Sequence, residues 1–157
     1  MQNQMTEPTD ALEAFFGPPI YSYTRAQALA DGVLVDMDHA TDDDGKKLSP
    51  FIFPVAMTRA AYAETIEAGG RWDFDPADPE SEILILPAGQ NVTGRLWDLF
   101  TMLRHAIRPN RPGERLPFSV LIDTHGNGRP HLVRLRAVCG PGDNYEPVIT
   151  IMLPTED

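Results

Sequence analysis

The sequence has very little cysteine. Cys139 is the only one among 157 residues, so the chain cannot form an internal disulfide. A chain without disulfides fits a reducing compartment, and we expect the protein in the cytoplasm. The sequence also lacks a run of roughly 18 apolar residues, which a membrane-spanning helix needs. Its first residues, MQNQMTEPTDALEAFF, are acidic rather than basic, so we expect no signal peptide.

Metal-ligand patterns are missing too. A zinc site has no signature here, because the histidines fall at no ligand spacing and no second cysteine is present. The segment Asp42–Gly45 resembles the start of a calcium loop, but Phe53 stands where the closing glutamate is needed. We therefore expect no bound metal and no cofactor. The four histidines are His39, His105, His125 and His131.

Motifs for catalysis and phosphate binding are absent as well. The sequence has no G-x-S-x-G nucleophile elbow. The glycine-rich turn Gly140–Asp143 precedes a predicted strand, so it lacks the helix N-terminus that would bind a phosphate. Nothing near Cys139 in the sequence would activate its thiol, and we expect a buried structural cysteine. The sequence therefore favours a protein that is not an enzyme.

Basic residues are few, and the acidic ones are unevenly spread. The net charge is −10, and residues 31–82 carry thirteen acids against four bases. Clustered positive charge is missing, which disfavours direct binding to nucleic acid. The acidic segments are either solubilising loops or a surface that meets a basic partner protein, such as one that itself binds nucleic acid. The candidate partner-binding residues are Asp36, Asp38, Asp42, Asp43, Asp44, Asp73, Asp75 and Asp78.

The longest segment with helical periodicity is Thr93–Arg108. Apolar residues recur three and four positions apart, which predicts one apolar stripe facing a core. Thr93 is the expected N-cap, and Pro109 ends the segment. Arginine and histidine in the last turn suit the negative end of the helix dipole. The stripe consists of Leu96, Leu99, Phe100, Leu103, Ala106 and Ile107, with Trp97 at its edge.

Two shorter helices are predicted before it. Thr24 and Gln27 form a capping box for a helix over Arg25–Ala30, which Gly32 ends. Thr58 caps a second helix over Arg59–Ala68. Short apolar segments between the helices are expected to be buried and extended: Val33–Val35, Phe51–Val55 and Glu82–Leu86.

The C-terminal third predicts a β-meander. Three predicted strands are separated by short, glycine-rich turns. Turns this short connect neighbouring strands in antiparallel orientation. The fold class is therefore α+β, with a C-terminal meander of three to four strands covered by the central helix. We expect a tail at residues 1–18 and one domain over 19–157, with acidic loops at 36–50 and 71–81. The strands are Leu116–Asp123, Pro130–Cys139 and Pro147–Leu153.

A ligand pocket is the alternative to partner binding. It would form if the N-terminal segment packed on the central helix and brought aromatic, basic and acidic side chains together. Arg95 and Asp98 lie three apart on that helix and could simply pair with each other. Arg134 and Arg136 share one face of their strand and could grip an anion or be solvated. The candidate pocket residues are Tyr21, Tyr23, Arg25, Arg95 and Asp98.

Four segments of the chain are specific as strings: Tyr21–Asp36, Phe53–Ala60, Gly94–Arg104 and Ala137–Asp157. Together they resemble a family of uncharacterised small proteins carried by plasmids and integrative elements of proteobacteria. They cover most of the chain in order, whereas the acidic segments at 42–47 and 71–86 depart from the pattern. The resemblance implies an accessory gene of mobile DNA and no known activity. In that setting we expect an inhibitor of host defence, of the anti-restriction or anti-CRISPR kind. The segments are YSYTRAQALADGVLVD (Tyr21–Asp36), FPVAMTRA (Phe53–Ala60), GRLWDLFTMLR (Gly94–Arg104) and AVCGPGDNYEPVITIMLPTED (Ala137–Asp157).

Overall fold

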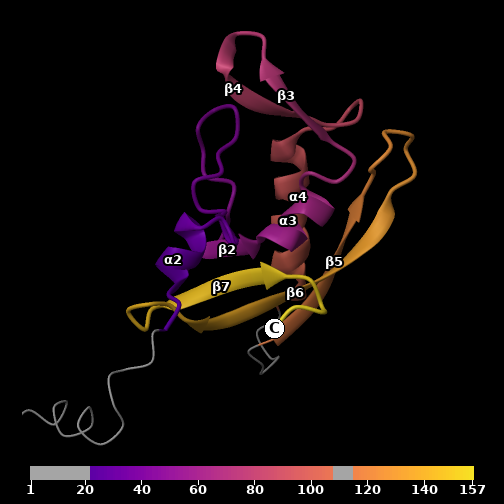
Figure 1. Cartoon of the computed structure of the whole chain (residues 1–157). Coiled ribbons are helices and arrows are strands. Elements are labelled where there is room, and N and C mark those ends of the chain that lie inside the picture. Colours follow the sequence, from indigo (N-terminus) through magenta and orange to yellow (C-terminus); the bar gives the residue numbers. More distant parts are fainter. Residues whose placement is uncertain (1–21, 108–114) are drawn as a thin grey trace, which may run out of the picture.

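The computed structural model describes residues 22–107 and 115–157, and the predicted tail at residues 1–18 lies outside them. The described part is α+β, as predicted, and most of its strands form one sheet beside the helices (Figure 1). In chain order the elements are α2 (Arg25–Ala30), β1 (Leu34–Asp36), β2 (Val55–Thr58), α3 (Arg59–Thr65), β3 (Arg71–Asp75), β4 (Asp78–Ile85), α4 (Val92–Ala106), β5 (Arg115–Ile122), β6 (His131–Pro141) and β7 (Pro147–Met152).

The main sheet has five strands in the order β1-β2-β7-β6-β5. Strands β5, β6 and β7 pair antiparallel, which confirms the predicted meander. The sheet is nevertheless mixed, because β2 pairs with β7 in parallel, through Val55 opposite Ile149 and Met57 opposite Ile151. The sequence did not predict that β1 and β2 join this sheet, since each is only three or four residues long and shows little alternation.

Helix α4 packs its apolar stripe against one face of the sheet. Leu99 and Leu103 are fully buried, and Phe100 makes an edge-to-face contact with Phe51 at 6.2 Å between ring centres. Burying one such leucine stabilises the fold by roughly 1.5–3 kcal/mol. The stripe is shorter than predicted, because the helix ends at Ala106 and Ile107 is 45% exposed.

The helix caps are confirmed with one correction. Thr24 and Gln27 form the capping box of α2, and Thr58 caps α3 by accepting a hydrogen bond from the Ala61 N–H. Asn91, rather than Thr93, caps α4. Its side-chain oxygen accepts a 2.6 Å bond from the Gly94 N–H, and the backbone at Asn91 is still extended.

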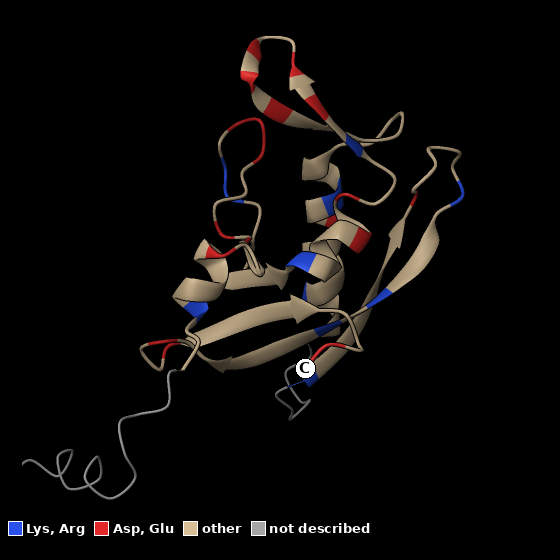
Figure 2. Ribbon diagram, viewed as in Figure 1, with Lys and Arg blue, Asp and Glu red and all other residues tan. Residues whose placement is uncertain are grey.

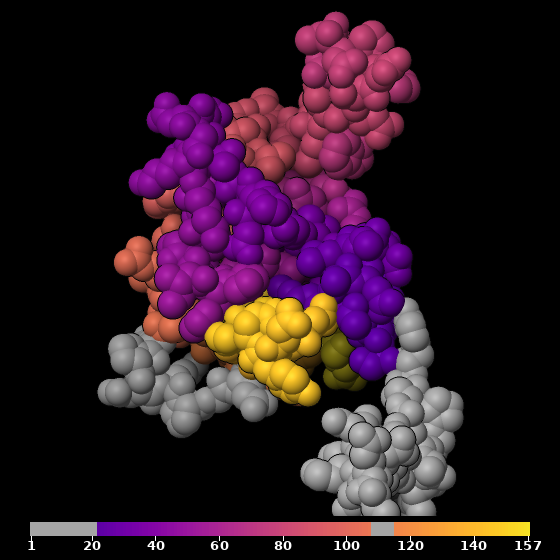
Figure 3. Space-filling view, turned by 90° about the vertical axis from the view of Figure 1, so that its left-hand side faces the viewer, coloured from indigo at the N-terminus to yellow at the C-terminus, as the bar shows by residue number. Residues whose placement is uncertain are grey.

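Residues 71–85 contain the largest departure from the predicted fold. A loop was expected at 71–81 and a buried strand at Glu82–Leu86, but β3 and β4 form a hairpin of their own. The hairpin stands away from the main sheet in both views (Figures 1 and 3). The apolar run Ile83–Leu86 is therefore half-buried or exposed, because no layer packs over it.

Two other expectations of burial are wrong in part. Phe51 packs on the core, but Ile52 is 90% exposed and Phe53 is also exposed, because the chain there bends before β2 begins. Val33 is likewise exposed, since it precedes an edge strand that is paired on one side only.

Candidate functional site

Acidic side chains gather at one end of the molecule. Figure 2 marks acidic residues in red along the ribbon of the loop at 36–47 and of the β3–β4 hairpin, which are far apart in the sequence. Figures 1 and 3 show both segments rising from the same end of the fold. We call these two segments, residues 36–47 and 71–85, the acidic end. All eight acids predicted as partner-binding residues belong to it.

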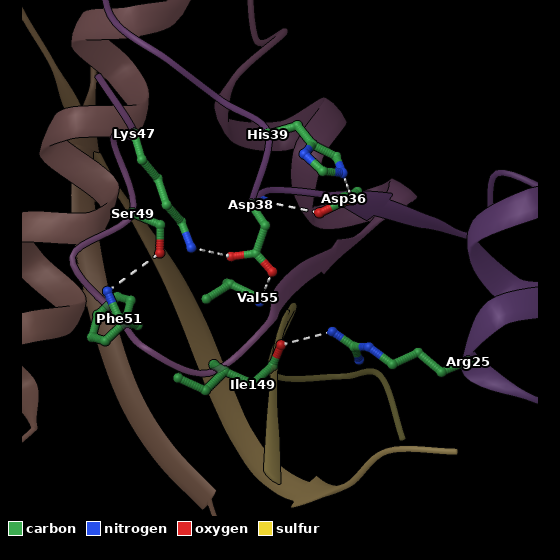
Figure 4. Close-up of polar contacts among 9 residues, drawn as sticks. All are labelled: Arg25, Asp36, Asp38, His39, Lys47, Ser49, Phe51, Val55 and Ile149. Carbon is green, nitrogen blue, oxygen red and sulfur yellow. Dashed lines mark hydrogen bonds and ion pairs between the residues drawn. The ribbon is translucent and has the colours of Figure 1, made fainter. Parts of the chain in front are cut away.

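The base of the acidic loop is held in place by its own aspartates (Figure 4). The Asp38 carboxylate accepts a 3.0 Å hydrogen bond from the Val55 N–H of β2 and pairs with Lys47 Nζ at 2.9 Å. Asp36 accepts a 2.8 Å bond from the Asp38 N–H and lies 3.2 Å from His39 Nε2. These two predicted surface acids therefore anchor the loop to the sheet, and Asp38 is half-buried.

The three aspartates at the tip of the loop have different roles. Asp42 accepts hydrogen bonds from the N–H groups of Asp44 and Lys46 at 3.1 and 2.8 Å, so its carboxylate shapes the turn. Asp43 and Asp44 are exposed, and their carboxylates bond to nothing in the described part of the chain. Only these two tip acids are thus free to meet a partner.

The hairpin uses three aspartates to hold its own shape. Asp73 pairs with Arg71 at 2.9 Å, and Asp75 accepts a bond from the Ala77 N–H in the turn. Asp78 accepts a 2.6 Å bond from the Ser81 hydroxyl, and this bond is the main cause that lowers the Asp78 pKa. All three contacts lie within the hairpin, so these aspartates shape it locally.

The hairpin also exposes residues that the sequence analysis missed. The carboxylates of Glu80 and Glu82 are exposed and have no partner among the residues described. Trp72 and Phe74 lie on one face of β3, with 52% and 66% of their surface exposed. The alternation in Arg71–Asp75, with aromatic side chains at every second position, is typical of a strand and could have revealed this face. The prolines at 76 and 79 favoured a loop instead.

The predicted ligand pocket does not assemble as one site. Arg25 donates to the Thr150 hydroxyl at 2.8 Å and to the Ile149 carbonyl at 3.1 Å, so it ties α2 to β7. The Tyr23 hydroxyl donates to Asp31 at 2.8 Å. Tyr21 lies outside the described residues. Tyr23 and Arg25 therefore hold α2 in place. They do not form a site with Arg95 and Asp98, the two candidates on α4.

Arg95, one of those two, is a buried structural residue. It is 4% exposed, and its Nε donates to the Gln90 side chain at 2.9 Å. Its Nη2 donates to the Asp123 carbonyl at 3.0 Å, at the end of β5. Three carbonyls at the end of α3 and just after it accept bonds from its Nη1 at 3.1, 3.0 and 2.7 Å: those of Thr65, Ile66 and Ala68. Arg95 therefore joins α3, α4 and β5, and each of its three guanidinium nitrogens donates within the fold.

Close packing accompanies this arginine. Gly69 follows the three carbonyls, has a positive φ of 72°, and faces the backbone of Thr124 so closely that a Cβ would collide with it. The Asp123 carboxylate holds the same turn by accepting backbone N–H bonds from residues 125–128. Burial alone would raise the Asp123 pKa, but these four bonds lower it overall.

Asp98 lies in a shallow depression of about 470 Å³ together with Arg95 and Asp123. The expected ion pair between Arg95 and Asp98 is not formed, because the guanidinium turns toward the carbonyls. Asp98 is largely exposed, and its partial burial in this depression raises its pKa. Trp97 is 59% exposed and lines a different depression, of about 520 Å³, beside Leu48 and Arg104.

The remaining candidates lie on β6. Arg134 is exposed, but Arg136 is half-buried and donates to the Glu156 carbonyl, so it secures the C-terminal turn. Cys139 is exposed, which corrects the expectation of a buried cysteine. The two arginines share one face of β6, as expected, and the opposite face enters the core through Val133, Leu135 and Ala137.

Residues 22–107 and 115–157 contain neither a metal-binding cluster nor a membrane-spanning helix. No three or more His, Cys, Asp or Glu side chains are grouped there in a way that could hold a metal ion. None of the described helices is both long and apolar enough to cross a membrane.

Comparison with known proteins places the chain in a family but gives it no activity. No curated protein and no solved structure matches it. A family of unknown function, DUF6573, matches residues 13–157, which include every described element and both parts of the acidic end. The chain therefore belongs to the DUF6573 family of unknown function.

Proposed function

We propose that this protein acts by binding a basic surface of another protein through its acidic end. The observation that carries the proposal is the meeting of two separate acidic segments at one end of the fold (Figure 2). Four exposed carboxylates there have no partner in the described chain: those of Asp43, Asp44, Glu80 and Glu82. Acids that only kept the protein soluble would not need to be gathered at one end.

Such an arrangement suits electrostatic attraction of a partner. Negative charge displayed on two projecting segments steers a positively charged surface toward them and speeds association. Asp38 at the base of the loop and Asp78 beside the turn of the hairpin fix the backbone near the free carboxylates, which lowers the entropy lost on binding.

The resemblance noted in the sequence suggests which partner to seek. If the gene belongs to mobile DNA, the partner is a host protein that handles nucleic acid in the cytoplasm, and its binding would inhibit a restriction or CRISPR defence. Proteins of that class carry basic surfaces for phosphates, which an acidic end would match. Activity as a small enzyme or ligand-binding protein is the alternative. The raised pKa of Asp98 in its depression favours this alternative, although all three guanidinium nitrogens of the neighbouring Arg95 already donate within the fold.

The test begins with capture of partners from a bacterial host lysate on the immobilised protein, followed by affinity measurement with the purified partner. We expect the dissociation constant to rise at least about tenfold, or 1.4 kcal/mol, for the variant Asp43→Lys, Asp44→Lys, Glu80→Lys, Glu82→Lys. Association should also slow as salt increases.

The control, Glu64→Lys and Asp157→Lys, reverses two exposed acids elsewhere, as many as the partial variant Asp43→Lys, Asp44→Lys, and should bind almost normally. Asp42 is left unchanged, because its carboxylate shapes the loop. An affinity that is the same at low and high salt, or equal losses in the two variants, would contradict the proposal.

A further inference from the structure

The hairpin presents an aromatic face that nothing in the described fold covers. Trp72 and Phe74 point to the same side of β3, since they are two residues apart on one strand. Their cross-strand partners on β4 are Leu84 and Glu82. One face of the hairpin therefore carries two large aromatic rings, one leucine and one unpaired carboxylate.

The exposed aromatic rings do not give the hairpin the packing that would stabilise it. An isolated two-stranded hairpin is only marginally stable in water, and an aromatic face usually packs on a third strand or a helix. Here the two strands pair only with each other among the described strands, and the hairpin stands clear of the body (Figure 3). Exposed aromatic residues on a projecting element are typical of binding anchors.

The charge around the aromatic face indicates what would cover it. Arg71 is the single base in residues 71–85, against five acids, and it already pairs with Asp73. A second copy of this face would bring like charges together, which is unfavourable. A basic surface would meet opposite charge at the rim and could bury the rings in its centre.

We infer that the β3–β4 hairpin is a docking arm that inserts Trp72 and Phe74 into an apolar groove with a basic rim on the partner protein. The inference rests on the proposed function and deepens it, because it assigns the affinity to apolar burial and the orientation to charge. Phe74 and Glu82 lie opposite each other, so an apolar anchor and a free carboxylate enter the partner side by side.

The two tryptophans of the chain permit a direct test. Trp72 is on the arm and Trp97 is on α4, and they are exposed to similar extents, 52% and 59%. The variant Trp97→Phe reports Trp72 fluorescence alone, and the variant Trp72→Phe reports Trp97 alone. The probes are an amphipathic peptide of lysine and leucine, a peptide of lysine and serine with the same charge, and a peptide of glutamate and leucine.

With the lysine–leucine peptide we expect the emission of Trp72 to shift to the blue while that of Trp97 stays unchanged. The substitution Phe74→Ser should weaken this binding about tenfold, as loss of an interface anchor does. The lysine–serine peptide should bind weakly and leave the Trp72 emission where it was. The glutamate–leucine peptide should not bind.

Other results would overturn the inference in distinguishable ways. If both lysine peptides bind equally and Trp72 does not respond, the docking arm is wrong and the acidic-end proposal stands. If neither lysine peptide binds, both proposals fail. If the Trp72 emission shifts with protein concentration alone, the face is covered by a second copy of this chain. Equal shifts of Trp72 and Trp97 would indicate nonspecific adhesion.

Discussion

Helix α4 and the β3–β4 hairpin use similar side chains in opposite ways. Leu99, Phe100 and Leu103 of α4 are almost completely buried against the sheet, whereas Trp72 and Phe74 of the hairpin are more than half exposed. The helical stripe packs against a second layer, and the hairpin packs against none that the described residues form. Apolar patterning therefore defines a face in both elements, but only packing against another element makes that face a core.

The polar side chains of α4 and of the hairpin also differ in how far their hydrogen bonds reach. Around α4, Arg95 bonds to carbonyls from other elements and so connects the body of the protein. In the hairpin, Asp75 and Asp78 bond to neighbours within four residues and maintain only the local turn. We expect the body to unfold as one unit and the hairpin to contribute little to its stability.

The largest expected effect on stability comes from the buried stripe of α4. The substitution Leu103→Ala removes a fully buried side chain and should lower the free energy of unfolding by roughly 2–5 kcal/mol. Denaturation by urea measures the change. Met102→Ala, at the next position and 44% exposed, is the matched control and should change little. A similar loss in both variants would show that α4 does not face a core.

The second effect concerns Arg95. The substitution Arg95→Met keeps much of the packing but leaves buried carbonyls without donors, which should destabilise the protein by roughly 1–3 kcal/mol. Arg104→Met, in an exposed position of the same helix, serves as the control. The same urea titration applies, and an unchanged midpoint for Arg95→Met would mean that water replaces the guanidinium without cost.

Elements with strong local signals could be predicted from the sequence. The stripe of α4, the capping box of α2, the Thr58 cap of α3 and the three-stranded meander all follow from spacing and capping rules. The parallel pairing of β2 with β7 could not be predicted, because it joins segments about ninety positions apart and depends on the whole chain between them.

The candidate site was predicted only as a charge pattern. The sequence shows where the acids are but not what they do. Asp42, whose carboxylate shapes a turn, and Asp43, whose carboxylate is free, are the same residue type. The hairpin was missed because Pro76 and Pro79 favoured a loop, although Pro76 lies in the turn and Pro79 lies in a register irregularity of β4.

A smaller effect separates two carboxyl groups, one in each region. Burial raises the pKa of Asp98 on α4, whereas hydrogen bonds from Ser81 and from a backbone N–H lower that of Asp78. NMR titration should therefore find Asp98 above the usual aspartate range and Asp78 below it.

The raised pKa of Asp98 also affects stability. Because the folded state binds this proton more tightly than the unfolded state, ionisation costs stability, and the cost appears as pH rises through the acid range. The variant Asp98→Asn should thus melt slightly higher than the original protein near neutral pH and lose this advantage at low pH. A melting difference that is the same at all pH values would contradict this explanation.

The smallest expected effect on stability concerns the aromatic face of the hairpin, and it tests most directly how the hairpin differs from α4. Replacing both Trp72 and Phe74 with serine should lower the free energy of unfolding by no more than about 1 kcal/mol, because the rings contribute strand propensity and local contact but no core. Hydrogen exchange in the same variant should leave the protection of the α4 and β6 amides unchanged, while the hairpin amides exchange faster. A loss comparable to that of Leu103→Ala would mean that the aromatic face is part of the folded core after all. Unchanged protection in α4 together with lost binding to a basic partner would instead assign the two rings to recognition alone.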